Sequence, residues 1–287
     1  MPESPARTLR VSIADELAEA AARLGKREAT ALWAAVANVT PGDVWLKRGG
    51  EPMPPVAQRF WEAVERRSRG IPFAYAVGRT VFRTLDLAID PRALIPRPET
   101  EGLVDLILQR VNGGLAADIG TGSGCIALSL AVEGNFDRVI AVERSAAAAT
   151  LARENVTLVQ PRAPVEIREG NLLGPLGDKG ERYRVIVSNP PYLTEDEYAA
   201  LDPTVRQFEP AEALVSGGDG LAATRALFAG AAALLEPGGG GILALEIDER
   251  RGDAVRALAH EYGWARIGIY NDLFGRPRYA LAFPGED

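Results

Sequence analysis

The chain has 287 residues, 47% of them hydrophobic and 25% charged, a balance that fits a folded globular protein and excludes an intrinsically disordered one. Its net charge of −7 disfavours binding to duplex DNA over a broad face, so no stable nucleic-acid partner is expected. No apolar stretch is long enough to span a membrane and the first ten residues lack the apolar core of a signal peptide, so we expect a cytoplasmic protein with no membrane partner.

The first seventy residues are predicted to form a small helical domain. Ser12 and Asp15 match a capping box at the start of an Ala/Leu-rich run. Apolar residues at helical spacing predict further helices over 31–37 and 56–69, while the Gly- and Pro-rich stretch 42–55 is expected to be a loop. This domain is either a scaffold without chemistry or a docking surface for a macromolecular substrate, and its sequence leaves both interpretations open.

An alternating apolar pattern after position 71 predicts a β-hairpin that links two domains. The predicted domains are a helical N-terminal substrate-docking domain over 1–72, a hairpin linker over 73–95 and a larger domain over 96–287. The larger domain begins within I-P-R-P-E-T-E (95–101), where two prolines stiffen the backbone and acidic residues favour a helix start. By itself, this stretch indicates only a rigid beginning for a helix that runs to Val111.

A glycine-rich turn follows in A-A-D-I-G-T-G-S-G (116–124), between an apolar strand and an Ala/Leu-rich helix. Glycines let this turn adopt positive φ and let a ligand reach main-chain N–H groups at the helix N-terminus. The spacing G-x-G-x-G, with Cys125 where the dinucleotide fingerprint has its last glycine, favours S-adenosylmethionine over NAD. The alternative is a turn kept only for close packing. The predicted cofactor contacts here are Gly120, Thr121, Gly122, Ser123 and Gly124.

Beyond this turn, strands and helices alternate, which predicts a doubly wound parallel sheet. A second strand over 138–142 ends at Glu143, about twenty positions after the glycines, where such folds hold the ribose hydroxyls of a nucleotide. The alternative is an exposed acid before a helix. Asn171 and Leu172 follow a third strand, and this topology predicts that they lie beside the adenine.

A fourth strand over 183–187 leads directly into S-N-P-P-Y (188–192). Two consecutive prolines stiffen the chain, so Asn189 is held at the carboxyl end of a strand, where open α/β sheets bind ligands. In isolation this motif is often only a turn. Next to a cofactor loop, it indicates a catalytic site.

The residue types in N-P-P-Y suit methylation of a planar nitrogen, which is a weak nucleophile because its lone pair is delocalised. The side-chain oxygen of Asn189 and the carbonyl of Pro190 are predicted to accept its N–H groups, to align it and to stabilise developing positive charge. Tyr192 is expected to pack over the planar group. No strong base is required. The predicted catalytic residues are Asn189 and Pro190, and the predicted substrate-binding residues are Asn189, Pro190, Pro191 and Tyr192.

The last part of the chain is predicted to complete the sheet. Segments 206–210 and 216–221 are expected to be loops before a helix that ends near Leu235. Strands over 242–247, 265–270 and 278–283 bring the predicted sheet to about seven strands.

The single cysteine and the single histidine carry no predicted chemistry. Cys125 cannot form an intramolecular disulfide or a cysteine-based metal cluster, and we expect it to be a small buried residue. His260 is expected to lie at the surface or at a helix end. No metal site is predicted.

Together, these motifs resemble the bacterial release-factor glutamine methyltransferases of the HemK/PrmC type, class I S-adenosylmethionine-dependent enzymes. The resemblance covers I-P-R-P-E-T-E, D-I-G-T-G-S-G and N-P-P-Y, together with P-F-A-Y-A-V-G (72–78), F-E-P (208–210), G-G-D-G-L (217–221) and E-I-D-E-R-R-G (246–252). N-P-P-Y alone is shared with adenine-N6 DNA methyltransferases. The combination of I-P-R-P-E-T-E with a small helical domain is specific to a much narrower group of enzymes.

The resemblance implies a Rossmann-like methyltransferase fold and methylation of the glutamine side-chain amide in the Gly-Gly-Gln motif of peptide chain release factors, with S-adenosylhomocysteine as product. The family's cofactor positions carry over to Gly120–Gly124, Glu143, Asn171, Leu172 and Asn189, and its substrate positions to Asn189–Tyr192. Two residues depart from the pattern. Asn171 stands where Asp is common, which weakens an adenine contact, and Arg251 replaces a frequent Gln.

Three alternatives stay open from the sequence. The enzyme could act on a ribosomal-protein glutamine, or it could be an adenine-N6 nucleic-acid methyltransferase, which the acidic charge and the absence of a recognisable target-recognition domain disfavour. The chain could also bind the cofactor without turnover, which the intact N-P-P-Y motif disfavours.

Overall fold

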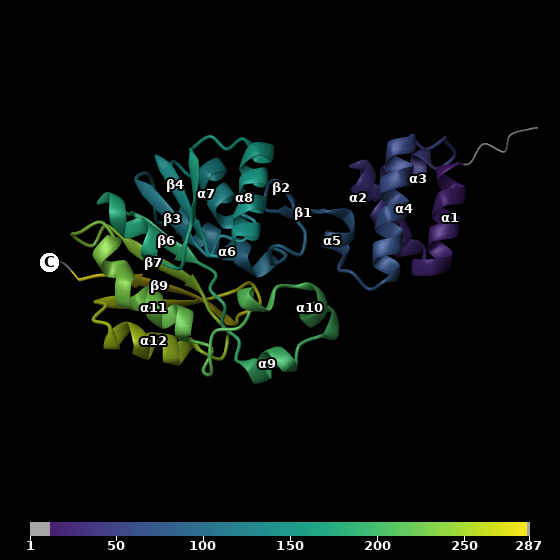
Figure 1. The fold of residues 1–287 in the computed structure, drawn as a ribbon. Coiled ribbons are helices and arrows are strands. Elements are labelled where there is room, and N and C mark those ends of the chain that lie inside the picture. Colours follow the sequence, from purple (N-terminus) through teal and green to yellow (C-terminus); the bar gives the residue numbers. More distant parts are fainter. Residues whose placement is uncertain (1–11, 286–287) are drawn as a thin grey trace, which may run out of the picture. The chain divides into compact units, whose positions relative to one another are not determined.

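The computed structural model describes residues 12–285, apart from the side chains of residues 178 and 179. The expectation about a signal peptide concerns the first ten residues, which lie outside this range. The chain separates into two compact units, the first ending at Gly78 and the second beginning at Arg79 (Figure 1). Each unit has its own buried apolar core.

The first unit is helical. Its core joins Leu32 and Trp33 to Phe60 and Val64, and the rings of Trp33 and Phe60 meet edge to face with centroids 4.8 Å apart. The predicted capping box is confirmed, because Ser12 and Asp15 cap each other's backbone at the first helix. The helices are α1 (Ile13–Leu24), α2 (Lys26–Ala37), α3 (Pro41–Lys47), α4 (Pro54–Ser68) and α5 (Phe73–Val77).

Two local predictions in this unit are wrong. The expected loop 42–55 contains most of α3, because Thr40 and Asp43 form a second capping box and Pro41 occupies the first helical turn. The first part of the predicted hairpin linker is the short helix α5, which ends at Gly78 with φ +79°. In both places, Gly and Pro mark the ends of short helices.

The second unit is built on a seven-stranded sheet with strand order β5-β4-β3-β6-β7-β9-β8, in which β9 pairs antiparallel with β7 and β8 and all other pairs are parallel. The predicted α/β fold is confirmed, with a helical N-terminal unit and a two-stranded hairpin ahead of the sheet. The hairpin is β1 (Arg79–Phe82) and β2 (Leu85–Ala88). The sheet strands are β3 (Leu115–Ile119), β4 (Arg138–Glu143), β5 (Val165–Glu169), β6 (Val185–Ser188), β7 (Ile242–Glu246), β8 (Arg266–Asn271) and β9 (Pro277–Phe283).

Helices cover both faces of this sheet (Figure 1). Neighbouring strand residues point to opposite faces, so Ala116 joins one apolar cluster with α6 (Pro98–Leu108) and α7 (Cys125–Glu133), while Ala117 joins the other with α11 (Ala222–Ala231) and α12 (Gly252–Glu261). Helix α7 is apolar nearly all round and is buried from Cys125 to Ala131, which confirms Cys125 as a small buried residue. The helices of this unit are α6 (Pro98–Leu108), α7 (Cys125–Glu133), α8 (Ala146–Val159), η1 (Gly174–Lys179), α9 (Glu195–Ala199), α10 (Pro203–Phe208), η2 (Ala211–Ala213), α11 (Ala222–Ala231), η3 (Ala232–Leu234) and α12 (Gly252–Glu261).

The segment between β6 and α11 is more ordered than predicted. Part of the expected loop 206–210 is the end of α10, which begins at a proline capped by Asp202, and α9 begins with a capping box of Thr194 and Glu197.

None of the helices within 12–285 combines the length and the apolarity needed to cross a bilayer.

Candidate functional site

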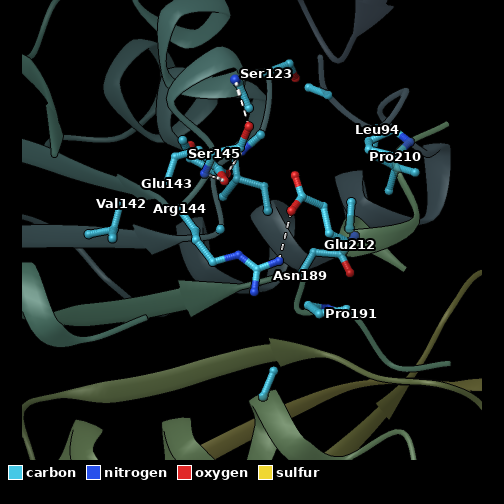
Figure 2. Close-up of a pocket in the computed structure, with 18 of the residues that line it drawn as sticks. Leu94, Ser123, Val142, Glu143, Arg144, Ser145, Asn189, Pro191, Pro210 and Glu212 are labelled. Carbon is cyan, nitrogen blue, oxygen red and sulfur yellow. Dashed lines mark hydrogen bonds and ion pairs between the residues drawn. The ribbon is translucent and has the colours of Figure 1, made fainter. Parts of the chain in front are cut away.

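A cavity of about 410 Å³ opens in the second unit at the carboxyl ends of β3, β4, β5 and β6 (Figure 2). This is the edge of an open α/β sheet where ligands bind, and the volume is within the range of small-molecule sites. Nine of the predicted site residues line it: Gly120, Thr121, Gly122, Ser123, Glu143, Asn171, Leu172, Asn189 and Pro191. Three others, Gly124, Pro190 and Tyr192, lie outside its lining.

The glycine turn is held in shape by Asp118 at the end of β3. Its Oδ2 accepts hydrogen bonds from Thr121 Oγ1 at 2.6 Å and from the backbone N–H of Ala127 at 3.1 Å. Burial raises the pKa of Asp118 to about 7. At Gly120, φ is +73° and no atom lies within 4 Å of where a Cβ would stand, so the turn leaves space beside its backbone.

Gly124 has a different role from the other glycines of the turn. It precedes α7 with φ +85°, and a Cβ there would meet Leu128 and Ala152 at 3.4 and 3.6 Å. Its position is therefore one of close helix packing.

Glu143 joins the glycine turn to the end of β4. Its Oε2 accepts from the backbone N–H of Gly122 and its Oε1 from that of Ser145, both at 2.9 Å. A carboxylate has about four acceptor positions, so both oxygens can accept further bonds from hydroxyl groups in the cavity. Figure 2 shows Glu143 beside Arg144 and Ser145 at this wall.

The chain after β5 forms another wall of the cavity through Asn171 and Leu172. Leu172 has φ +47°, a left-handed conformation that a leucine rarely adopts. Such strain concentrates at ligand sites, where the surrounding structure has to maintain it.

Asn189 is fixed at the end of β6. The preceding Ser188 donates from Oγ to the carbonyl of Ile119 at 2.6 Å, which anchors this end of β6 to β3. Asn189 donates from Nδ2 to Thr100 Oγ1 at 3.1 Å, and Thr100 donates to Glu246 Oε2 at 2.7 Å. Burial raises the pKa of Glu246 to about 7.

Beyond Asn189, Pro191 still lines the cavity, while Pro190 and Tyr192 lie outside its lining in a packed loop. Pro190 is buried and Tyr192 half-buried. The backbone N–H groups of Tyr192 and Leu193 both donate to the carbonyl of Leu214, and burial raises the pKa of Tyr192 to about 12. The loop is therefore set by backbone contacts as well as by its prolines.

Several motifs that indicated no chemistry by themselves shape the site. Arg97 of I-P-R-P-E-T-E pairs with Glu209 of F-E-P, and this joins two segments that line the cavity. Thr100 and Glu246, which sequence reasoning did not place in the site, hold Asn189. The only sequence signal for them was their presence in motifs of the resembling family.

Arg251, one of the two departures from the family pattern, ties helix α9 to two loops. It pairs with Glu197 Oε2 at 2.6 Å and with Asp248 Oδ1 at 3.4 Å, and it donates from Nε to the carbonyl of Asp219 at 3.2 Å. Gly220 passes close beside it, since a Cβ there would lie 2.8 Å from Arg251 Nη2. The Arg251 guanidinium thus contacts Glu197, Asp248 and Asp219 at once.

Comparisons with known proteins agree with this architecture. The family model described as "Methyltransferase small domain" matches residues 99–236, and that described as "PrmC N-terminal domain" matches 8–78. The fold is shared with a methyltransferase from Pyrococcus furiosus, with a TM-score of 0.51 and 21% identity over 70% of this chain and 89% of that one.

Curated relatives are much closer in sequence. The release factor glutamine methyltransferase of Xylella fastidiosa is 44% identical, covering 83% of this chain and 86% of the relative. That of Moorella thermoacetica is 42% identical, covering 82% of each. The resemblance carried by the motifs is confirmed: this chain belongs to the release factor glutamine methyltransferase family.

Proposed function

We propose that this protein transfers a methyl group from S-adenosylmethionine to the side-chain amide nitrogen of the glutamine in the Gly-Gly-Gln motif of peptide chain release factors. Family membership supports the reaction, since its relatives carry that name. The observation that carries the proposal is the meeting of Asn189 with the glycine turn and Glu143 in one cavity of about 410 Å³. A nucleotide-like methyl donor and a planar amide can be held there together.

The chemistry of the cavity fits S-adenosylmethionine. Within the described part of the chain, Ser123 Oγ is buried yet has no hydrogen-bond partner, and Gly120 leaves open space beside its backbone. We propose that residues 120–123 form the contact for the amino-acid part, with Gly124 completing the turn that presents them, that Glu143 accepts the ribose hydroxyls, and that Asn171 and Leu172 flank the adenine. When bound, S-adenosylmethionine supplies an electrophilic methyl group on a sulfonium.

The chain's own groups then act on the substrate amide. Asn189 Oδ1 and the Pro190 carbonyl accept its two N–H groups, which aligns the nitrogen and stabilises the positive charge that develops on it. Pro191 and Tyr192 complete the proposed substrate contacts. Because stabilisation comes from oriented acceptors, no strong base is needed at the moment of transfer, and the nitrogen loses its surplus proton to water once the new C–N bond has formed.

The N-terminal domain (1–72), helical in the part from residue 12 on that the structure describes, is proposed to dock the release factor. In this unit the large side chains of Trp45, Leu46 and Met53 are exposed, although such side chains are usually buried. We propose that they contribute to the contact with the release factor, since exposed apolar groups mark protein-binding surfaces where they gather in a patch. The proposed docking domain adds affinity for the whole protein substrate that a short peptide cannot use.

The function is tested with labelled S-adenosylmethionine and a panel of substrates. These are a release factor, the same factor with Gly-Gly-Ala in place of Gly-Gly-Gln, ribosomal proteins and DNA. Label on the unaltered release factor alone is expected. Label on ribosomal proteins or on DNA would assign one of the alternative substrates, and bound cofactor without transfer to any of them would indicate a binding protein.

A further inference from the structure

Three side chains from distant parts of the sequence form a continuous chain of hydrogen bonds beside the cavity. Asn189 follows β6, Thr100 lies in the first turn of α6, and Glu246 ends β7. Thr100 and Glu246 are 146 positions apart, and each is only 2% exposed. Asn189 Nδ2 lies 3.1 Å from Thr100 Oγ1, which in turn lies 2.7 Å from Glu246 Oε2.

While Glu246 is ionised, counting protons fixes the direction of this chain. A threonine hydroxyl has one proton and two lone pairs. When the Glu246 carboxylate accepts that proton, Thr100 Oγ1 can only accept from its other neighbour. That neighbour is Asn189, which must therefore point its N–H group at Thr100. Asn189 Oδ1 is thus turned away from Thr100.

We propose that Thr100 and Glu246 are positioning residues that hold the Asn189 amide with Oδ1, rather than Nδ2, available to the substrate nitrogen. This inference rests on the proposed function, because it assigns a role within the same site. The oxygen and nitrogen ends of an asparagine amide have nearly the same shape, so packing alone selects weakly between them. The hydrogen-bond chain selects by chemistry.

The orientation matters because the two ends have opposite electrostatic effects. With Oδ1 toward the substrate, Asn189 accepts an N–H and stabilises positive charge in the transition state. With Nδ2 there, two donors face each other and the developing charge is opposed. Linked hydrogen bonds also polarise one another, so a carboxylate at the far end strengthens the acceptor character of Oδ1.

A purely structural interpretation is that Thr100 serves only to satisfy the buried Glu246. Thr100→Val removes the hydroxyl at nearly constant shape, and Thr100→Ser retains it. We expect Thr100→Val to lower kcat by about 10-fold or more, with the Kd for S-adenosylmethionine changed less than about 3-fold. Thr100→Ser is expected to restore kcat to within about 3-fold of the wild type. A Thr100→Val enzyme with unchanged kcat would overturn the proposal.

A double-mutant cycle separates the two interpretations further. If Thr100 acts through Asn189, Thr100→Val causes no further loss of turnover in an Asn189→Ala background. If its role is structural, the two losses multiply, which contradicts the inference. Melting temperatures of all variants show whether each one folds.

A readout independent of turnover distinguishes failure of this inference from failure of the proposed function. The side-chain amide protons of Asn189, assigned by their loss in Asn189→Ala, are expected to exchange slowly with solvent in the wild type and in Thr100→Ser, and faster in Thr100→Val. Equal exchange in all three would refute the hydrogen-bond chain. Slow exchange in a wild type that does not methylate a release factor would instead retain the chain and reject the function.

Discussion

Arg97 Nη2 lies 2.7 Å from Oε1 and 2.8 Å from Oε2 of Glu209, and this ion pair holds two walls of the cavity together. The Glu209 side chain is only 3% exposed, and it also accepts from the backbone N–H of Ile95 at 3.3 Å. Because it is this deeply buried, the carboxylate depends on Arg97 for charge compensation. Breaking this pair should therefore affect both the stability of the protein and the binding of a ligand in the cavity.

Glu209→Gln is expected to weaken both binding and stability, because Arg97 loses its charged partner and the two walls separate more easily. We expect a Kd for S-adenosylmethionine raised about 10-fold and a free energy of unfolding lowered by on the order of 2 kcal/mol. Calorimetric titration and urea denaturation measure the two effects.

The matched control is Glu212→Gln at the same cavity. Glu212 pairs with Arg144 at 3.1 Å, but both side chains are more than half exposed (Figure 2). Exposed pairs contribute about 1 kcal/mol or less, so both quantities should stay near the wild type. Equal losses in the two variants would show that burial of the Arg97–Glu209 pair does not determine donor affinity or stability.

Asn189→Ala is expected to lower turnover by on the order of 100-fold or more while retaining most of the affinity for the methyl donor, since it removes a transition-state contact. Asn171→Ala serves as the contrasting amide. It should weaken donor binding with little change in kcat at saturating donor. Single-turnover rates and donor titrations measure the two quantities, and unchanged turnover in Asn189→Ala would remove that residue from catalysis.

Glu246→Gln is expected to stabilise the protein at high pH. The pKa of Glu246 is raised from an ordinary 4.5 to about 7, chiefly by burial and also by the nearby Glu99, against the opposing effects of Thr100, Arg278 and Arg97. Since the folded state binds the extra proton between these values, the free energy of unfolding falls as pH rises from about 4.5 to 7. The variant does not titrate there, so near pH 8 it should be more stable than the wild type by on the order of 3 kcal/mol.

Urea denaturation at pH 4.5 and pH 8 checks this difference. At pH 4.5, the two proteins should have similar free energies of unfolding, because Glu246 is then neutral as well. Paired carboxylates with lowered pKa, such as Glu181, act in the opposite direction but are common to both proteins and cancel. A stability difference that does not change with pH would show that Glu246 does not titrate as its burial implies.

Gly220→Ala is expected to disturb the contact between the loop 217–221 and the last residue of N-P-P-Y. Gly220 has φ +72°, and a Cβ there would lie 2.4 Å from the carbonyl oxygen of Tyr192. We expect a loss of on the order of 2 kcal/mol in stability, together with reduced kcat. The matched control is Gly218→Ala, in the segment G-G-D-G-L (217–221) that also contains Gly220. A Cβ at Gly218 would meet no atom within 4 Å, so this variant should be nearly neutral. Thermal melting and steady-state assays compare the two, and equal behaviour would mean that the loop adapts.

Much of the sheet could be predicted because buried parallel strands are short apolar runs that end in polar residues. Strand β6 is buried throughout, and Asn189 follows it directly. The glycine turn and Glu143 were found in the same way, from their spacing within one strand–turn–helix unit and the next strand. Local patterns are sufficient where neighbouring elements of the chain build the site.

Contacts between distant segments could not be predicted in this way. Arg97 and Glu209 are 112 positions apart, and the sequence shows no pattern that pairs these two charges among 71 charged residues. Short helices were missed although their signals are local, because those signals are ambiguous. Helix α3 depends on a cap and a proline, and in sequence these signals look like those of a loop.

The exposed side chains of α3 give the last prediction, which concerns docking of the protein substrate. Trp45 is 62% exposed and Leu46 73% exposed. Replacing both by Ala should raise KM for an intact release factor about 10-fold or more, because tryptophan is enriched among the few residues that dominate binding at protein interfaces. KM for a short Gly-Gly-Gln peptide should not change. Leu158→Ala, on the exposed side of α8, controls for loss of a surface apolar group. Equal KM shifts for protein and peptide would make the helical unit a stability element, since a docking surface affects only a substrate large enough to reach it.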